Sequence, residues 1–187
     1  AHKKWQIRRN SYKEIATMFE KASRGEKYYF IGPDNEEIEY NPIEKYQEWI
    51  IRMIRDSNLI AQYEGLNTLL TYLNYAPDVK NATMSALPDL LDKINHSKNN
   101  FRDITIKIVE LMFEREMGHH IIPELLKRFK TARNTKITEF SIQLLEYILV
   151  TDRYTDIINF KHVFNAISNT LTDHHKSIRD AGIQLLK

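Results

Sequence analysis

The sequence lacks cysteine altogether and holds only five glycines and five prolines in 187 residues. Without cysteine there are no disulfides, thiolate zinc sites or cysteine nucleophiles, and the composition fits a reducing compartment. Glycine and proline interrupt helices, so their scarcity is typical of helix bundles and helical solenoids. No apolar run approaches the roughly 18 residues of a membrane span, and no hydrophobic signal segment follows the basic N-terminus. We therefore expect a helical protein with no membrane partner.

A strong excess of one charge sign is also missing. The chain has 27 Lys and Arg against 25 Asp and Glu, a formal charge of +2, which is too small to indicate a nucleic-acid partner. Hydrophobic residues make up 42% and charged residues 28%, a balance typical of a globular domain. The positions of the charges are therefore more informative than their sum.

Four short polar turns, each followed by a helix and accompanied by basic side chains, recur along the chain. Their centres are Ser57, Lys98, Thr135 and His175, and the steps between them are 41, 37 and 40 residues. A period near 40 in a helical chain indicates stacked helix pairs of the HEAT type. Because stacking places equivalent turns on one edge, we expect the four turns to form a single ridge that carries the function.

Apolar residues recur every three or four positions through most of the chain, which predicts helices. The predicted helices cover 5–22, 43–55, 59–75, 81–95, 101–117, 119–131, 136–150, 154–171 and 176–187. Gly118 is predicted to end the helix before it. In the helix at 43–55, the side chains predicted to face inward are Tyr46, Trp49, Ile50 and Met53.

The pattern predicts one all-α HEAT-repeat solenoid over residues 1–187, interrupted by a polar insertion at about 23–41. Within the insertion, residues 28–31 can form a short extended piece. Trp5 opens a helix that has no preceding partner, and Leu185 and Leu186 have no following one. Because terminal repeats need neighbours or caps, we expect a fragment that lacks at least one helix at each end.

The residues that could support catalysis do not form a recognisable motif. His119-His120 and His174-His175 are adjacent pairs, and adjacent residues on a helix point about 100° apart, so neither pair is predicted to hold a metal. The acidic run 36–39 is interpreted as a solvated loop. There is no nucleophile elbow or glycine-rich phosphate loop. We expect no enzymatic activity, no catalytic residue, no metal and no cofactor.

The expected ridge carries a row of cations with an aromatic residue at one end. Adjacent cations would lie about 10 Å apart, the spacing of packed helices, which suits an acidic protein surface, and a tryptophan can supply the desolvated anchor that charges cannot. The candidate site residues are Trp5, Arg8, Asn58, Lys98, Arg102, Lys136, Lys176 and Arg179.

Each of these candidates also has a structural interpretation. Lysines and arginines in turns are often merely solvated. Arg102 and Arg179 are each followed by an aspartate, Asp103 and Asp180, so they can belong to an internal ladder of ion pairs. Trp5 can be a core residue rather than a contact.

Two segments resemble the TOG domain family. Residues 2–14, His-Lys-Lys-Trp-Gln-Ile-Arg-Arg-Asn-Ser-Tyr-Lys-Glu, resemble the family's opening motif His-Lys-x-Trp-Lys-x-Arg-x-x-x-Tyr-Glu-Glu, with Gln6 in place of a lysine. Residues 56–66, Asp-Ser-Asn-Leu-Ile-Ala-Gln-Tyr-Glu-Gly-Leu, are similar to its second motif, Asp-Ser-Asn-x-x-Ala-Gln-x-x-Gly-Leu. The later turns align as well, so the resemblance spans the chain. It is strongest to the first TOG domain of the mini-spindles-type microtubule polymerases.

This resemblance implies a monomeric paddle of HEAT repeats whose loops bind one α/β-tubulin heterodimer. It implies a microtubule-associated protein of the cytoplasm and cytoskeleton, acting at microtubule plus ends, the spindle or an organising centre to regulate microtubule growth. Trp5 and Asn58 would face β-tubulin. The basic contacts, the later ones toward α-tubulin, would come from Lys98, Arg102, Lys136, Lys176 and Arg179. The alternative is a HEAT scaffold or adaptor, which would bind another protein through its concave helix surface.

Overall fold

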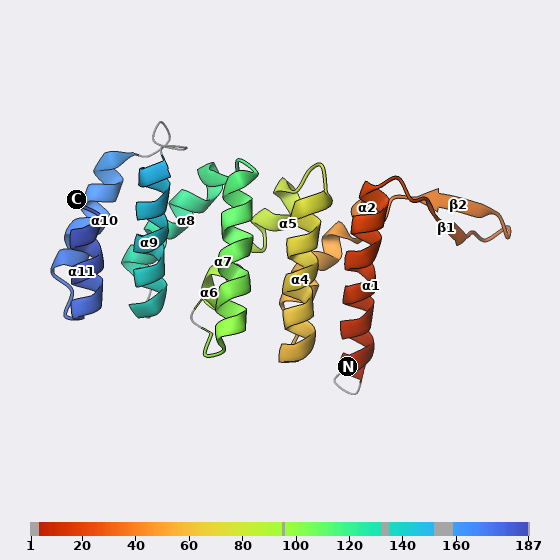
Figure 1. The fold of residues 1–187 in the computed structure, drawn as a ribbon, viewed down its shortest axis with the longest axis horizontal. Coiled ribbons are helices and arrows are strands. Elements are labelled where there is room, and N and C mark those ends of the chain that lie inside the picture. Colours follow the sequence, from red (N-terminus) through yellow and green to blue (C-terminus); the bar gives the residue numbers. More distant parts are fainter. Residues whose placement is uncertain (1–3, 95, 132–134, 152–158, 187) are drawn as a thin grey trace. The chain divides into compact units, whose positions relative to one another are not determined.

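A computed structural model describes residues 4–94, 96–131, 135–151 and 159–186. The chain forms two compact units, Ala1–Leu90 with Asp103–Leu111 and Leu91–Arg102 with Met112–Lys187. Each unit is built from paired helices, and a short hairpin belongs to the first (Figure 1). The predicted all-α HEAT-repeat fold is confirmed. No helix in the described part of the chain is both long enough and apolar enough to span a membrane.

The elements follow one another as short and long helices. They are α1 (Trp5–Ser23), β1 (Tyr28–Ile31), β2 (Glu37–Tyr40), α2 (Pro42–Tyr46), a 3-10 helix (Gln47–Trp49), α3 (Ile50–Ile54), α4 (Leu59–Tyr75), α5 (Lys80–Met84), α6 (Leu87–Lys93), α7 (Asn99–Glu114), α8 (Gly118–Thr131), α9 (Thr135–Thr151), α10 (Phe160–Leu171) and α11 (Lys176–Gln184). Of the helix predicted at 154–171, residues 154–158 lie outside the described ranges.

The packing of α1 against α4 forms the centre of the first unit. The Thr68 hydroxyl donates to the carbonyl oxygen of Tyr12 at 3.0 Å, and further along both helices the rings of Phe19 and Tyr72 meet edge to face at 5.5 Å. Contacts therefore advance in the same direction along both helices, so α1 and α4 are parallel. Their N-terminal ends lie on the same side of the unit.

The helix predicted at 43–55 is broken, and one of its predicted core residues is wrong. Ile50 and Met53 are buried, but Trp49 is 49% exposed. Residues 47–49 form a 3-10 turn, in which each residue advances the helix by about 120° instead of 100°. That change rotates Trp49 away from the core, and its ring lies 5.5 Å from the guanidinium of Arg52.

The helix predicted at 81–95 is also two helices, α5 and α6. The break lies just before Pro88. In a continuous helix the proline ring would clash with the carbonyl of Met84, four residues earlier. Starting a new helix at Leu87 places the proline in a first turn, where its missing N–H costs nothing.

The insertion contains a hairpin, of which the sequence predicted only one strand. β1 and β2 are antiparallel, with Tyr28 opposite Tyr40 and Ile31 opposite Glu37. Asn35, with φ of 61°, supplies the left-handed residue of the connecting loop, a conformation that asparagine tolerates well. The second strand was missed because its glutamates were interpreted as a solvated loop.

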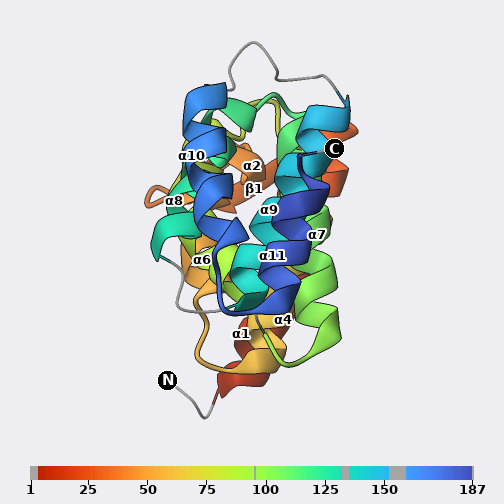
Figure 2. The same cartoon turned by 90° about the vertical axis from the view of Figure 1, so that its left-hand side faces the viewer.

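In the second unit, α8 packs beside α10, and α9 packs beside α11 (Figure 2). The predicted role of Gly118 is wrong, because Gly118 begins α8 instead of ending α7. Glu116, with φ of 61°, ends α7. Its N–H donates to the carbonyl of Phe113, and the N–H of Met117 donates to that of Met112. This pair of bonds is a Schellman motif, and burial of both methionines completes it.

Candidate functional site

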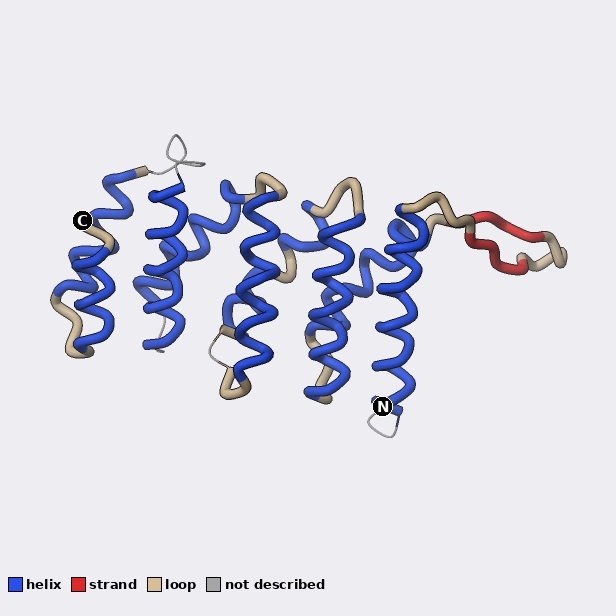
Figure 3. The backbone as a smooth tube through the Cα atoms, viewed as in Figure 1, coloured by secondary structure: helices blue, strands red, loops and turns tan. Residues whose placement is uncertain are grey.

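Three turns that precede α4, α7 and α11 share one construction (Figure 3). We call residues 56–58, 96–98 and 173–175 the pre-helix turns; they lead into α4, α7 and α11. In each, the side chain of the first residue accepts a hydrogen bond from the N–H of the third, which closes a tight turn. The backbone nitrogen of Asn58 lies 2.9 Å from Asp56 Oδ1, and that of Lys98 lies 3.2 Å from His96 Nδ1. The backbone nitrogen of His175 lies 2.8 Å from Asp173 Oδ1.

The helix starts at the next residue in all three cases. The first residues of α4 and α7, Leu59 and Asn99, are therefore separated by the same 40 positions as their turns. The corresponding turn before α9 falls on residues 132–134, outside the described part of the chain. Within the second unit, the turn before α7, the start of α9 and the turn before α11 lie at the same end of their helices (Figure 1). The helix starts of the second unit therefore share one edge, as the expected ridge requires, and the first unit contributes a single pre-helix turn, the one before α4.

A second hydrogen bond closes two of these turns, those before α4 and α11, from the helix side. Six residues after the turn begins, the Gln62 amide donates to the carbonyl of Asp56 at 3.0 Å. In the third turn, Arg179 Nη1 donates to the carbonyls of Asp173 at 2.7 Å and His174 at 3.0 Å. Arg102 holds the equivalent position before α7 and is half-buried. A neutral amide does at α4 what a guanidinium does at α11, so closing the turn does not require charge.

Asp56 anchors the first of these turns to α1. Its carboxylate accepts bonds from Arg8 Nε at 2.7 Å, Arg8 Nη2 at 2.8 Å and the Tyr12 hydroxyl at 2.9 Å, besides the N–H of Asn58. The Asp56 side chain is 3% exposed and that of Arg8 27%. Arg8 is thus held in a two-pronged ion pair within the protein, at the position where the sequence suggested a contact to a partner.

These contacts shift the ionisation of every group in the cluster. The bonds from Arg8 lower the pKa of Asp56 to about 2, helped by the N–H of Asn58 and the Tyr12 hydroxyl and opposed by burial. Burial raises the pKa of Tyr12 to about 12, and its bond to Asp56 acts in the same direction. The hydrogen bonds that Arg8 itself donates to Asp56 raise the pKa of Arg8. The pair is therefore fully ionised at neutral pH.

Asn58 serves as the N-cap of α4. Its side-chain oxygen accepts from the N–H groups of Ile60 at 3.0 Å and Ala61 at 3.2 Å. These are donors that an uncapped helix leaves without partners. The motif Asp-Ser-Asn therefore specifies a turn and a cap, and it fixes where the next two side chains point.

The start of α4 exposes an apolar pair that the sequence analysis did not single out. Leu59 is 40% and Ile60 51% exposed. Arg9 and Glu64 face each other across α1 and α4 at 3.7 Å. One turn toward the N-terminal end of these parallel helices lie Trp5, which is half-buried, and Ile60. We call Trp5, Leu59 and Ile60 the apolar edge of the first unit.

The second unit presents lysines at the corresponding helix starts. Lys98, Lys136 and Lys176 are exposed. Lys98 and Lys136 are next to the first residues of α7 and α9, and Lys176 is the first residue of α11. Among the described residues, no hydrogen bond or ion pair holds the side-chain ammonium of Lys98 or Lys176. Trp5, Arg8 and Asn58 thus come together in the first unit, and the remaining candidates gather in the second.

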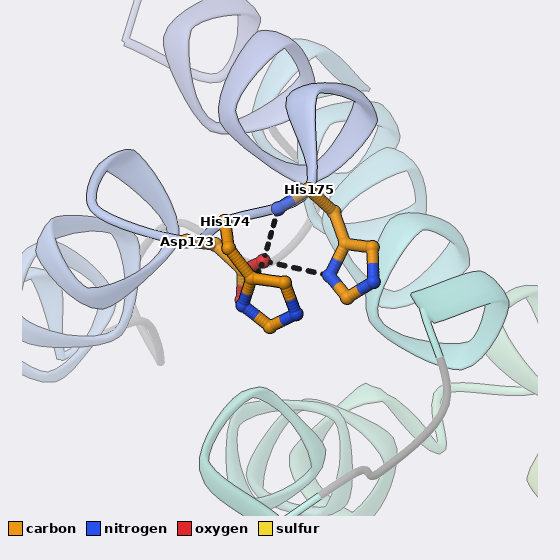
Figure 4. A group of neighbouring side chains, drawn as sticks. All are labelled: Asp173, His174 and His175. Carbon is orange, nitrogen blue, oxygen red and sulfur yellow. Dashed lines mark hydrogen bonds and ion pairs between the residues drawn. The ribbon is translucent and has the colours of Figure 1, made fainter.

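Asp173, His174 and His175 form the one group with metal-ligand character within the described residues (Figure 4). The histidines lie in a turn and not within a helix, so the separation of about 100° between adjacent helical residues does not hold for them. Their Nδ1 atoms lie 3.6 Å and 3.0 Å from one carboxylate oxygen of Asp173. The N–H of His175 bonds to that same oxygen and is the main cause of the lowered Asp173 pKa. The carboxylate is thus occupied in shaping the turn.

Comparisons with known proteins agree with this geometry. The family model described as XMAP215/Dis1/CLASP, TOG domain, matches residues 1–187. Protein mini spindles of Drosophila melanogaster is 23% identical over 185 residues, which cover 98% of this chain and 8% of that protein. The match extends across both units and includes all three pre-helix turns. The chain therefore belongs to the XMAP215/Dis1/CLASP family of TOG domains.

Proposed function

We propose that this chain binds an α/β-tubulin heterodimer through its pre-helix turns and helps to regulate microtubule growth as a module of a larger microtubule-associated protein. The observation that carries the proposal is the shared construction of the turns, which leaves an apolar edge in the first unit and exposed lysines in the second. Family membership supports the choice of tubulin. We further propose that the domain binds as a monomer and that its parent protein acts at microtubule plus ends.

We propose that the candidate residues have three different roles. The apolar edge supplies an anchor from which water is excluded, as the strongest contacts in protein interfaces require. Lys98, Lys136 and Lys176 supply attraction to an acidic surface, which governs the encounter rate and orientation more than the final affinity. Arg8, Asn58 and Arg179 shape and hold the turns, and we assign the same role to Arg102 from its equivalent position before α7.

Tubulin binding is tested by titrating labelled, unpolymerised tubulin with the purified domain. We expect a one-to-one complex, weakened by at least about tenfold in Trp5→Ala because the aromatic anchor is removed. Replacing Lys98 and Lys176 together by alanine should weaken the complex and flatten its dependence on salt. Lys27→Ala is the matched control, since Lys27 is an exposed lysine beyond the opposite end of α1. Absence of a complex at micromolar concentrations, or equal affinity in all variants, would contradict the proposal.

Substitutions at Arg179 can distinguish closure of the turn before α11 from direct contact of the side chain with tubulin. Glutamine at this position should close the turn as Gln62 does before α4, so Arg179→Gln should keep tubulin affinity and slow hydrogen exchange at the His175 N–H. Arg179→Ala should speed that exchange and weaken binding several-fold, because the turn opens. Lys176→Gln should weaken binding without changing the exchange. If Arg179→Gln binds as poorly as Arg179→Ala while its exchange stays slow, Arg179 contacts tubulin through its charge.

A further inference from the structure

Among the described residues, β1 pairs with β2 along one edge and has no strand partner along its outer edge. Gly32 N–H donates to the carbonyl of Glu36 at 2.8 Å, and bonded pairs alternate along an antiparallel ladder. Phe30 and Tyr28 therefore direct their backbone groups toward β2, whereas Tyr29 and Ile31 direct theirs outward. The hairpin has only two strands, so this edge can accept another.

The side chains along this edge are apolar and exposed. Tyr29 is 48%, Phe30 40% and Ile31 62% exposed, and β1 contains no charged residue. Proteins usually protect an edge strand with charges, bulges or a covering segment, because a bare apolar edge pairs with other chains. A row of exposed apolar side chains next to unpaired backbone groups is a surface suited to strand addition.

The charge around the edge specifies what kind of strand it suits. Residues 26–40 contain five acidic residues and one basic residue, although the whole chain carries a charge of +2. The one basic residue, Lys27, is paired with Glu39 at 3.0 Å. Glu37 lies on the same face as Tyr29 and Ile31, since side chains alternate along a strand and Glu37 is opposite Ile31. A partner on this face thus meets apolar groups bordered by carboxylates.

The other face of the hairpin is already occupied by the protein itself. The Lys45 ammonium lies 4.6 Å from the ring centre of Phe30 and 3.9 Å from that of Tyr40, which are cation–π distances. These contacts hold the hairpin against α2. The face that carries Tyr29 and Ile31 points away from them.

The hairpin is remote from the apolar edge of the first unit. Trp5 lies at the start of α1, and the hairpin follows its end (Figure 1). The 19 residues of α1 span about 28 Å at 1.5 Å each. Because the hairpin is negatively charged, it would be repelled by the acidic surface that the lysines of the second unit would bind. Both surfaces can therefore be occupied at once by different partners.

We propose that the hairpin binds an extended basic segment of a partner protein, in which apolar side chains alternate with lysine or arginine, as a third strand along β1. The apolar side chains would pack on Tyr29 and Ile31, and the basic ones would reach Glu37 and its neighbours. Main-chain bonds to the outward groups of Tyr29 and Ile31 would hold the segment in register. This inference does not depend on tubulin binding.

The test uses fluorescence anisotropy with a labelled peptide in which lysine and valine alternate. We expect saturable binding that weakens with added salt, and a loss of up to about fivefold in Ile31→Ser, since cross-strand apolar pairs contribute up to about 1 kcal/mol each. Tyr29→Pro should have a similar or larger effect, because proline removes an outward N–H without breaking the ladder to β2. Trp5→Ala is the control and should bind the peptide normally.

Three results would overturn the proposal. The first is equal binding of a peptide in which alternate backbone amides are methylated, since strand addition needs those amides. The second is equal binding of a peptide that alternates glutamate and valine. The third is a loss of tubulin affinity in Ile31→Ser, which would assign the hairpin to the tubulin surface. Circular dichroism of each variant confirms that the helices are intact.

Discussion

Asp56→Ala should lower the free energy of unfolding by about 3 kcal/mol, the usual cost of removing one partner from a buried ion pair. The substitution deletes the acceptor of four hydrogen bonds, from Arg8, Tyr12 and the N–H of Asn58. It leaves the Tyr12 hydroxyl buried without its partner. Urea denaturation followed by circular dichroism measures the effect.

A surface ion pair provides the control for Asp56. Arg55 bonds to Asp89 at 2.6 Å, but their side chains are 58% and 30% exposed. Arg55→Ala should therefore cost much less stability than Asp56→Ala. Arg8→Lys should resemble Asp56→Ala more closely, because a lysine cannot make the two-pronged contact. Similar losses in Arg55→Ala and Asp56→Ala would show that the Asp56 cluster does not hold α1 to the turn before α4.

The same cluster should make stability fall in acid. The pKa of Asp56 is about 2 in the folded protein and about 3.9 in an unfolded chain. Because the folded value is lower, ionised Asp56 stabilises the fold fully above about pH 4, and this contribution is lost as the pH falls through about 2. Its size is about 2 kcal/mol. Denaturation midpoints of the wild type and Asp56→Ala should therefore converge between these pH values.

Gly65→Ala should destabilise the first unit by about 2 kcal/mol, in the range usual for overpacking a close-packed core. A Cβ built on Gly65 lies 2.5 Å from the carbonyl carbon and oxygen of Met53. Both atoms belong to the backbone of α3, so α3 and α4 would have to separate. The higher helix propensity of alanine, worth about 1 kcal/mol, offsets only part of this cost. Thermal and urea unfolding measure it.

Gly182→Ala is the matched control for this effect. The atom nearest to a Cβ there is the side-chain hydroxyl oxygen of Thr170, and a side chain can rotate where a backbone cannot. We expect a smaller loss of stability than in Gly65→Ala. An unchanged stability in Gly65→Ala would mean that α3 and α4 can move apart without cost, contrary to the close packing described above.

The sequence predicted features that depend on neighbours along the chain. Apolar spacing located the helices, the recurring turns indicated HEAT repeats, and Asn58 was recognised within a turn at a helix start. The sequence also indicated the exposed apolar pair at the start of α4. Leu59 and Ile60 occupy the positions where the next turn has Asn99 and Asn100, so an apolar pair stands where polar residues are sufficient for the fold.

Features that depend on distant residues required the tertiary structure. Arg8 and Asp56 are 48 positions apart, and nothing in either segment alone shows that one neutralises the other. Arg179 was interpreted as a contact because its charge is visible in the sequence, whereas its bonds to the carbonyls of the turn are not. Trp49 lies outside the core because residues 47–49 form a 3-10 turn, which the spacing of apolar residues does not predict.

The sequence by itself determined the helical class, the repeat and the family motifs, because helix periodicity, caps and turns are set by residues within a few positions of one another. The tertiary structure decided which cations remain available to a partner, which apolar side chains stay exposed, and that the insertion forms a hairpin. These properties depend on which groups pack together, and a buried partner removes a charge or an apolar surface from the reach of any other molecule.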